Sequence, residues 1–172
     1  MYNDFVLVGP YQDPAKILGM QNVTDALKLI LDSNSSFISR GDNSGTHIAE
    51  KRLWEDAKIG EAELSGGWYR EIGSGMGATL NMASAVDAYT LSDRATWLSF
   101  GNKGTLKVMV EEDPRLFNQY GVIAVSANRY PSVNQKGARK FIKWLTGRKG
   151  QAQIAKFKVN GRQLFFPNAA DY

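Results

Sequence analysis

The sequence SFISRGDNSGTHIAE, residues 36–50, predicts the local fold around which the rest of the chain is arranged. Phe37 and Ile38 read as the end of a short buried strand, and the Gly, Ser, Asp and Asn residues that follow are typical of a turn. From Thr46 onward the pattern is helical, with Ala49, Leu53 and Ala57 spaced by four. The stretch therefore predicts a strand, a loop and a helix N-terminus in succession.

A loop that leads into a helix N-terminus is a favourable site for an anion. Its backbone N–H groups are unpaired, and the positive end of the helix dipole points at it. Arg40 adds a charged guanidinium, and Ser39, Ser44 and Thr46 add hydroxyl donors. We therefore expect this loop to bind a small oxyanion.

A purely structural interpretation of the same residues stays open. Ser44 is a good helix N-cap for the N–H of His47, and Asp42 can cap in the same way. Arg40 then pairs with Glu50 or with another surface acid.

A second strand, polar turn and helix start occurs at residues 88–98. Residues 88–91 predict a short strand, and Ser92-Asp93-Arg94 predicts a turn before a helix. If the two strands are neighbours in a parallel sheet, both loops emerge at the same edge, so Arg94 and Arg40 point towards one anion. The alternative is that Arg94 pairs with Asp93 or with a more distant acid.

A glycine-rich segment, residues 66–77, precedes a third helix over residues 78–88. It is neither a complete dinucleotide fingerprint nor a Walker loop. A tight turn is favoured over a phosphate cradle. Trp68 and Tyr69, within this segment, are expected to belong to the wall or the core.

Strands alternate with helices along the whole chain. Apolar runs predict buried strands at Phe5–Val8, Leu106–Val110 and Gly121–Val125, and amphipathic patterns predict helices that include Val23–Ile30 and Asn134–Leu145. The pattern predicts an α/β fold with a mainly parallel sheet flanked by helices. The runs near the two ends of the chain bracket the candidate anion loops, as two strands that cross between lobes would.

Composition excludes several classes of function. The 172 residues include no Cys and one His, which rules out disulfides, thiolate metal sites, Cys nucleophiles and multi-His metal sites. The net charge of +4 fits an anionic ligand but is too small to indicate a nucleic-acid partner. No apolar run approaches the roughly 20 residues that span a membrane.

Residues spread over nearly the whole chain match one known family. They are Tyr2–Pro10 with Asp13-Pro14, Phe37–His47 with Glu50, Trp68-Tyr69 with Gly75–Gly77, Tyr89–Arg94, the return strand Tyr120–Val125 and the helix Phe141–Leu145. On these residues the chain resembles the tungstate-binding proteins of ABC uptake systems, a branch of the type II periplasmic binding protein fold.

The resemblance implies a two-lobed protein that closes on a tetrahedral oxyanion, tungstate or molybdate. It implies an ABC transporter permease as partner, no cofactor, no catalysis, and a periplasmic or extracellular location directed by a signal or lipid anchor outside this sequence. Arg40 and Thr46 are carried over as ligand residues, with Ser39 and Ser44 beside them. Arg94 is added because it matches a motif position.

The resemblance also implies that part of the second lobe is missing. Family members begin earlier, with a Thr- and Ser-rich stretch that holds the anion from the opposite lobe. We therefore expect a complete ligand-binding lobe over residues 10–118, with crossover strands and C-terminal helices of an incomplete lobe over residues 1–9 and 119–172. The expected result is a tendency to dimerise through exposed apolar surface near Phe141, Leu145, Phe165 and Phe166.

Two other functions remain as alternatives. An enzyme that acts on phosphate esters would have to use Asp42, Asp93 or His47, and no motif places these residues together. An oxyanion-sensing domain of a transcription regulator shares the fold, but the sequence contains no helix-turn-helix segment.

Overall fold

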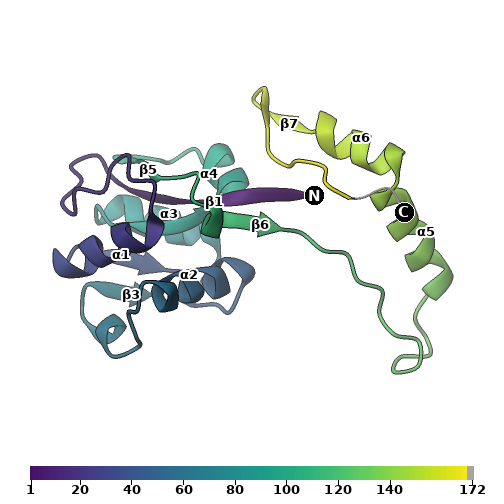
Figure 1. Ribbon diagram of the computed structural model, residues 1–172, viewed down its shortest axis with the longest axis horizontal. Helices are drawn as coiled ribbons and strands as arrows, with labels where there is room; N and C mark the ends of the chain where they lie inside the picture. The colour runs from purple at the N-terminus through teal and green to yellow at the C-terminus, as the bar shows by residue number, and fades with distance from the viewer. Residues whose placement is uncertain (170–172) are drawn as a thin grey trace. The chain divides into compact units, whose positions relative to one another are not determined.

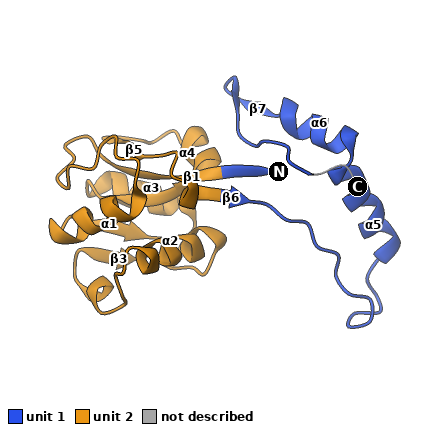
Figure 2. Cartoon of the chain, in the orientation of Figure 1, with its two compact units in different colours: residues 1–3, 118–172 blue, residues 4–117 orange. Residues whose placement is uncertain are grey.

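The computed structural model describes residues 1–169 and divides into two compact units (Figures 1 and 2). Unit 2 comprises residues 4–117, and unit 1 comprises residues 1–3 and the chain from residue 118 onward. The elements in chain order up to the end of unit 2 are β1 (Tyr2–Pro10), α1 (Val23–Asp32), β2 (Phe37–Ser39), α2 (Gly45–Asp56), a 3₁₀ turn (Glu63–Ser65), β3 (Tyr69–Glu71), α3 (Met76–Ala85), β4 (Thr90–Asp93), α4 (Arg94–Ser99), β5 (Leu106–Val110), a second 3₁₀ turn (Pro114–Leu116) and β6 (Phe117–Gln119).

The first strand, β1, lies between β4 and β5 and is antiparallel to both. β2 pairs with β3 in parallel, and a parallel bridge joins Phe37 to Tyr89, immediately before β4. Strands β2 to β5 therefore run in one direction, and β1 runs against them. The predicted α/β fold is confirmed. The pairing is mixed rather than mainly parallel because β1 pairs with distant strands and not with β2, its successor along the chain.

Alternation along the strands divides the core of unit 2 into two apolar clusters. Leu7 and Phe37 belong to one cluster, which includes buried side chains of α1 and α2. Val6, Val8 and Ile38 belong to the other, which includes buried side chains of α3. Successive side chains of a strand point to opposite faces of the sheet, so β1 and β2 each contribute to both clusters.

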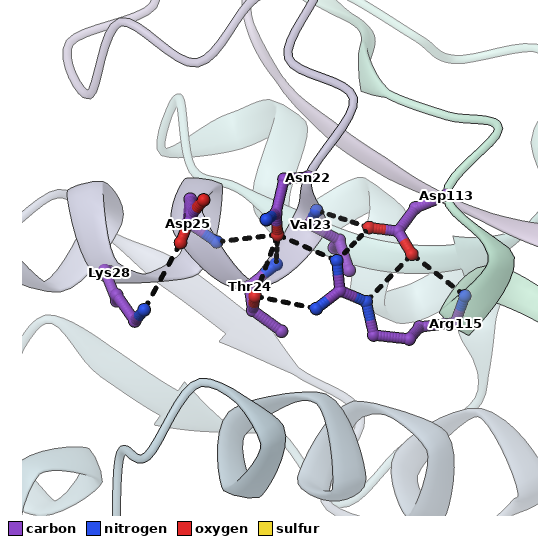
Figure 3. A network of polar contacts seen from close by, with 7 residues as sticks. All are labelled: Asn22, Val23, Thr24, Asp25, Lys28, Asp113 and Arg115. Carbon is purple, nitrogen blue, oxygen red and sulfur yellow. Dashed lines mark hydrogen bonds and ion pairs between the residues drawn. The ribbon is translucent and has the colours of Figure 1, made fainter.

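The N-terminus of α1 is fixed by a polar network (Figure 3). The N-cap is Asn22, whose Oδ1 accepts from the N–H groups of Thr24 and Asp25. The buried Asp113 accepts from the N–H of Val23 at 2.8 Å and from the guanidinium of Arg115. Burial alone would raise the pKa of Asp113, but these hydrogen bonds outweigh it and hold the pKa below its ordinary value.

Unit 1 contains two helices and a short hairpin. α5 (Gln135–Thr146) begins at the N-cap Asn134, α6 (Arg148–Lys156) follows after Gly147, and β7 (Lys158–Val159) pairs with β8 (Arg162–Gln163). None of the helices within residues 1–169 is long and apolar enough to span a membrane.

The prediction of a buried strand at Gly121–Val125 is wrong. These residues form no strand, and Ile123 is 90% exposed. An apolar run becomes a buried strand only beside a partner strand, and the described part of unit 1 pairs its two hairpin strands with each other. Phe141 and Phe166 are exposed, as expected, whereas Leu145 and Phe165 are partly buried.

Candidate functional site

The candidate site is the loop between β2 and α2. Two residues of this loop, Gly41 and Asn43, have positive φ angles of 61° and 56°, so the chain turns sharply before the helix begins. Ser44 is the N-cap of α2, and its Oγ accepts from the N–H of His47 at 3.3 Å, as the structural interpretation predicts. Thr46 is buried in the first turn of α2.

Arg40 pairs within the loop and not with Glu50. Its Nη2 donates to Asp42 Oδ2 at 2.5 Å, and Asp42 Oδ1 accepts from the N–H of Ser44. Hydrogen bonds from Ser44 and Arg40 hold the pKa of Asp42 at about 2. The Nε of Arg40 is buried and has no hydrogen-bond partner among the described residues. Arg40 is therefore held in place by one nitrogen and keeps a second donor unused.

Ser39 ends β2 on the side of the sheet that α2 covers. Phe37 and Ser39 point to one face because they are two residues apart, and Trp54 of α2 contacts the Phe37 ring at 5.1 Å between centroids. Ser39 is completely buried, and its Oγ forms no hydrogen bond of normal geometry with any described residue. A buried hydroxyl without a partner is uncommon in folded proteins and requires an explanation.

A buried carboxyl lies on the covered face of α2. Glu50 is 2% exposed, and its Oε1 accepts from the Tyr69 hydroxyl at 2.7 Å and from Trp54 Nε1 at 3.3 Å. Burial raises the pKa of Glu50 to about 7, although the hydrogen bonds from Tyr69 and Trp54 act in the opposite direction.

From the sequence, Glu50 is expected as a surface partner of Arg40 and as one of the residues that match the family, so its burial is missed. The position of Glu50 in the sequence indicates its burial. Glu50 stands three residues before Leu53 and four before Trp54, and both of these lie on the buried face of α2.

The only histidine of the chain, His47, has a structural role in this loop. Its Nδ1 accepts from the N–H of Asn43 at 3.1 Å, which assigns the proton to Nε2, and Nε2 lies 3.1 Å from Glu71 Oε1. His47 therefore holds the loop onto β3. The other two residues considered for catalysis are also engaged, since Asp42 pairs with Arg40 and Asp93 is the N-cap of α4.

The loop before α3 contacts the loop between β2 and α2. The N–H of Ser74 donates to the carbonyl of Arg40 at 3.0 Å, and Gly75, the N-cap residue of α3, provides no side-chain cap. Gly73 has a φ of 60°, in agreement with the tight turn that the glycines predict. Because β2 and β3 are parallel neighbours, the N-termini of α2 and α3 open at one edge of the sheet.

The guanidinium of Arg94 is occupied by two carboxylates. Its Nε and Nη2 donate to Asp4 at 2.6 Å each, and its Nη1 donates to Glu111 at 2.7 Å. The hydrogen bonds with Asp4 and then Glu111 raise the pKa of Arg94, against the effect of burial. The structure thus brings Ser39, Arg40, Ser44 and Thr46 together in one loop and helix start. It gives Arg94 the distant acidic partners that the sequence left open, and an anion would have to displace one of them.

Comparisons with known proteins place this fold and loop in a family. The model of a family described as a PBP superfamily domain matches residues 1–149. The tungstate-binding protein TupA of Peptoclostridium acidaminophilum is 43% identical over 174 residues, and that of Campylobacter jejuni is 36% identical over 173 residues. These alignments cover 99% and 98% of the present chain, which spans 60% and 63% of the lengths of those two relatives.

A solved structure agrees with the same assignment. The tungstate-binding protein TupA of Desulfovibrio alaskensis superimposes with a TM-score of 0.82 and 43% sequence identity, over 99% of this chain and 69% of that one. The chain therefore belongs to the PBP superfamily, in the branch that contains these tungstate-binding proteins.

Proposed function

We propose that this chain is the ligand-binding part of a solute-binding protein that takes up tungstate, in the periplasm or outside the cell, and delivers it to an ABC transporter permease. Molybdate, of the same tetrahedral shape and charge, is the second ligand expected. The names of the relatives support the ligand class, and the loop between β2 and α2 supplies its chemistry. The protein binds its ligand without transforming it.

The observation that carries the proposal is the pair of buried donors without partners. Ser39 Oγ and Arg40 Nε are adjacent in the chain, and both lack a hydrogen-bond partner among the described residues. Leaving such a group unpaired costs roughly 1–3 kcal/mol, and more for a charged group. A ligand with several acceptor oxygens would satisfy both donors and recover this free energy.

The charge of the site selects an anion. Arg40 carries a full positive charge, and the first N–H groups of α2, at Gly45 and Thr46, add the positive end of the helix dipole. Asp42 orients Arg40 through Nη2 and leaves Nε for the ligand. A dianion that loses its water needs donors on every oxygen in return, which this combination of guanidinium, hydroxyl and backbone N–H groups provides in part.

Isothermal titration calorimetry with sodium tungstate tests the proposal on this chain. Arg40→Ala is expected to weaken binding by roughly 2–5 kcal/mol, the range for removing one partner of a buried charged pair. Arg52→Ala is the matched control, because Arg52 is an exposed arginine on α2 and its loss changes net charge equally. Equal affinities of the wild type and Arg40→Ala would disprove the role of Arg40.

A thermal-shift series distinguishes the ligands. Tungstate, molybdate, sulfate and phosphate are added separately, and an anion that binds only the native state raises the melting temperature according to its affinity. We expect the largest shift with tungstate and the next largest with molybdate. A shift confined to phosphate would refute the proposed ligand class.

A further inference from the structure

We propose that a basic stripe on α5, made of Lys136, Arg139, Lys140 and Lys143, holds this protein on an anionic phospholipid surface. The biological meaning of the stripe rests on the proposed function, because a protein that delivers tungstate to a permease acts at the membrane that contains the permease. The proposal gives unit 1 a role separate from that of the anion loop in unit 2.

The charges of the chain are divided unevenly between the two units. Unit 2 contains eleven Lys and Arg residues against sixteen Asp and Glu residues, so its side chains carry a net charge of −5. Residues 1–3 and 118–169, the described part of unit 1, contain ten Lys and Arg residues and no Asp or Glu. The modest net charge of the whole chain therefore includes one region of a single sign. Such asymmetry is typical of a protein that binds a polyanionic surface.

The ten cations of unit 1 are exposed and form no ion pair with a described residue. Every ion pair among residues 1–169 joins two residues of unit 2. The ten exposed residues are Arg129, Lys136, Arg139, Lys140, Lys143, Arg148, Lys149, Lys156, Lys158 and Arg162. Like charges repel one another in the folded unit, and an anionic surface relieves that repulsion.

The sequence of α5, in unit 1 (Figure 2), gathers four of these cations on one side of the helix. The basic stripe occupies positions i, i+3, i+4 and i+7 counted from Lys136, and such positions share one helix face. An apolar stripe with the same spacing begins two residues later and contains Ala138, Phe141, Ile142 and Leu145. Two residues correspond to a rotation of about 200° around the helix axis. The basic stripe therefore faces away from the apolar stripe and stays accessible whatever covers the apolar stripe.

α6 strengthens the positive potential around the stripe. It contacts α5 and carries Arg148, Lys149 and Lys156. Lys149 and Lys156 are seven residues apart, so they share one face of α6. Because the potentials of neighbouring cations add, α5 and α6 together attract an anionic surface more strongly than the stripe would alone.

The residue types of the stripe favour lipid headgroups over an acidic protein surface. Three of its four residues are Lys, a flexible and strongly hydrated point charge. Protein interfaces are depleted in Lys and enriched in Arg, whereas an anionic bilayer attracts either residue without requiring a fixed geometry. A protein held on the membrane also has a higher effective concentration near its permease than a protein free in solution.

Co-sedimentation of the full chain with lipid vesicles tests the proposal. The vesicles contain phosphatidylcholine with about 30% phosphatidylglycerol, or phosphatidylcholine alone, in about 0.1 M NaCl. The wild type is expected to bind the first vesicles and to remain in solution with the second. Replacing all four residues of the stripe by Gln is expected to weaken binding by at least about 100-fold, because each cation near an anionic bilayer contributes about fivefold.

A matched control separates the stripe from net charge. It replaces Lys16, Lys28, Arg52 and Lys58 of unit 2 by Gln, again three Lys and one Arg, all exposed. Net charge falls by the same amount as in the stripe variant, and binding to the anionic vesicles is expected to weaken by less than about fivefold. Tungstate affinity, measured by calorimetry on the stripe variant, is expected to equal that of the wild type.

A second measurement needs no variant and so covers the case in which the stripe variant does not fold. Raising NaCl from about 0.05 M to about 0.5 M shortens the screening length several-fold and is expected to release the wild type from the anionic vesicles. Binding that persists at the higher salt concentration would overturn the electrostatic attachment.

The other outcomes are equally decisive. A wild type that ignores the anionic vesicles, or binds the neutral ones equally well, overturns the proposal. Equal losses in the stripe variant and the control show that net charge acts without the stripe, and they overturn it too. Binding of polyglutamate or duplex DNA without binding of vesicles indicates an acidic protein or a nucleic acid as the partner instead. A chain that binds the anionic vesicles through the stripe but binds no tungstate refutes the proposed function alone.

Discussion

Replacing Asp113 by Ala is expected to destabilise unit 2 more than any surface substitution. The carboxylate of Asp113 is almost completely buried, and it accepts from the N–H of Val23, the first residue of α1, at 2.8 Å. It also accepts from the backbone N–H of Arg115 at 2.9 Å and from the Arg115 guanidinium at 2.9 and 2.6 Å. Removing it leaves these donors without their acceptor (Figure 3).

The magnitude follows from how deeply each donor is buried. A hydrogen bond from a backbone N–H to a charged group contributes about 1.5–3 kcal/mol, and the Val23 N–H has no solvent to replace it. The Arg115 side chain is 36% exposed, so water screens its ion pair and it adds less than about 1 kcal/mol. We therefore expect Asp113→Ala to lower the free energy of unfolding by about 3 kcal/mol.

Urea unfolding monitored by tryptophan fluorescence measures this loss. Asp113→Asn is the matched control, because its side-chain oxygen can still accept from Val23, and we expect it to lose about half as much. The pKa of Asp113 is lowered in the folded state, so its contribution is present above the ordinary aspartate pKa of 3.8 and disappears as the pH falls through the folded-state value. A loss below about 1 kcal/mol at neutral pH would show that the network does not stabilise α1.

Three further predictions concern single residues of unit 2. Because burial raises the pKa of Glu50 from 4.5 to about 7, the wild type should lose roughly 3 kcal/mol of unfolding free energy as the pH rises through this interval. Glu50→Gln should abolish that loss, as measured by urea titrations at about pH 5 and 8. Gly41→Ala should destabilise the protein by about 1–3 kcal/mol in thermal unfolding, since Gly41 has a positive φ and a Cβ there would lie 2.7 Å from a side-chain carbon of β3. Gly77→Ala, the control at an exposed helical position with open space, should stabilise the protein slightly. Tyr89→Phe should cost about 1–2 kcal/mol, because its hydroxyl bridges a carboxylate oxygen and a backbone N–H at 2.8 and 3.0 Å; an equal loss in Tyr11→Phe, where the side chain is 72% exposed, would contradict this reason.

Local patterns were enough to predict most elements of unit 2 and the order of strand, loop and helix around residues 37–57. The Ser44 cap, the helix that follows Asn134 and the strand Leu106–Val110 were all predicted, because each depends on neighbours within a few residues. The family resemblance, carried by long motifs, gave the fold and the family.

Long-range contacts account for what was missed. Arg94 pairs with Asp4, 90 residues away, and no local pattern encodes that contact. The apolar run at Gly121–Val125 has the composition of a strand, but a strand also needs a partner at its side. Glu50 was overlooked as a buried acid because a charged residue is normally assigned to the surface.

The place of β1 in the sheet also determines when unit 2 can fold during synthesis. β1 leaves the ribosome before its partners β4 and β5, which end at Asp93 and Val110. Until those residues emerge, the apolar residues of β1 have no strand to pair with. The nascent chain then exposes unpaired backbone N–H and C=O groups along β1, which can pair with other chains. The sheet is closed late by contacts of large sequence separation, which predicts slow folding and makes the growing chain a natural client for chaperones.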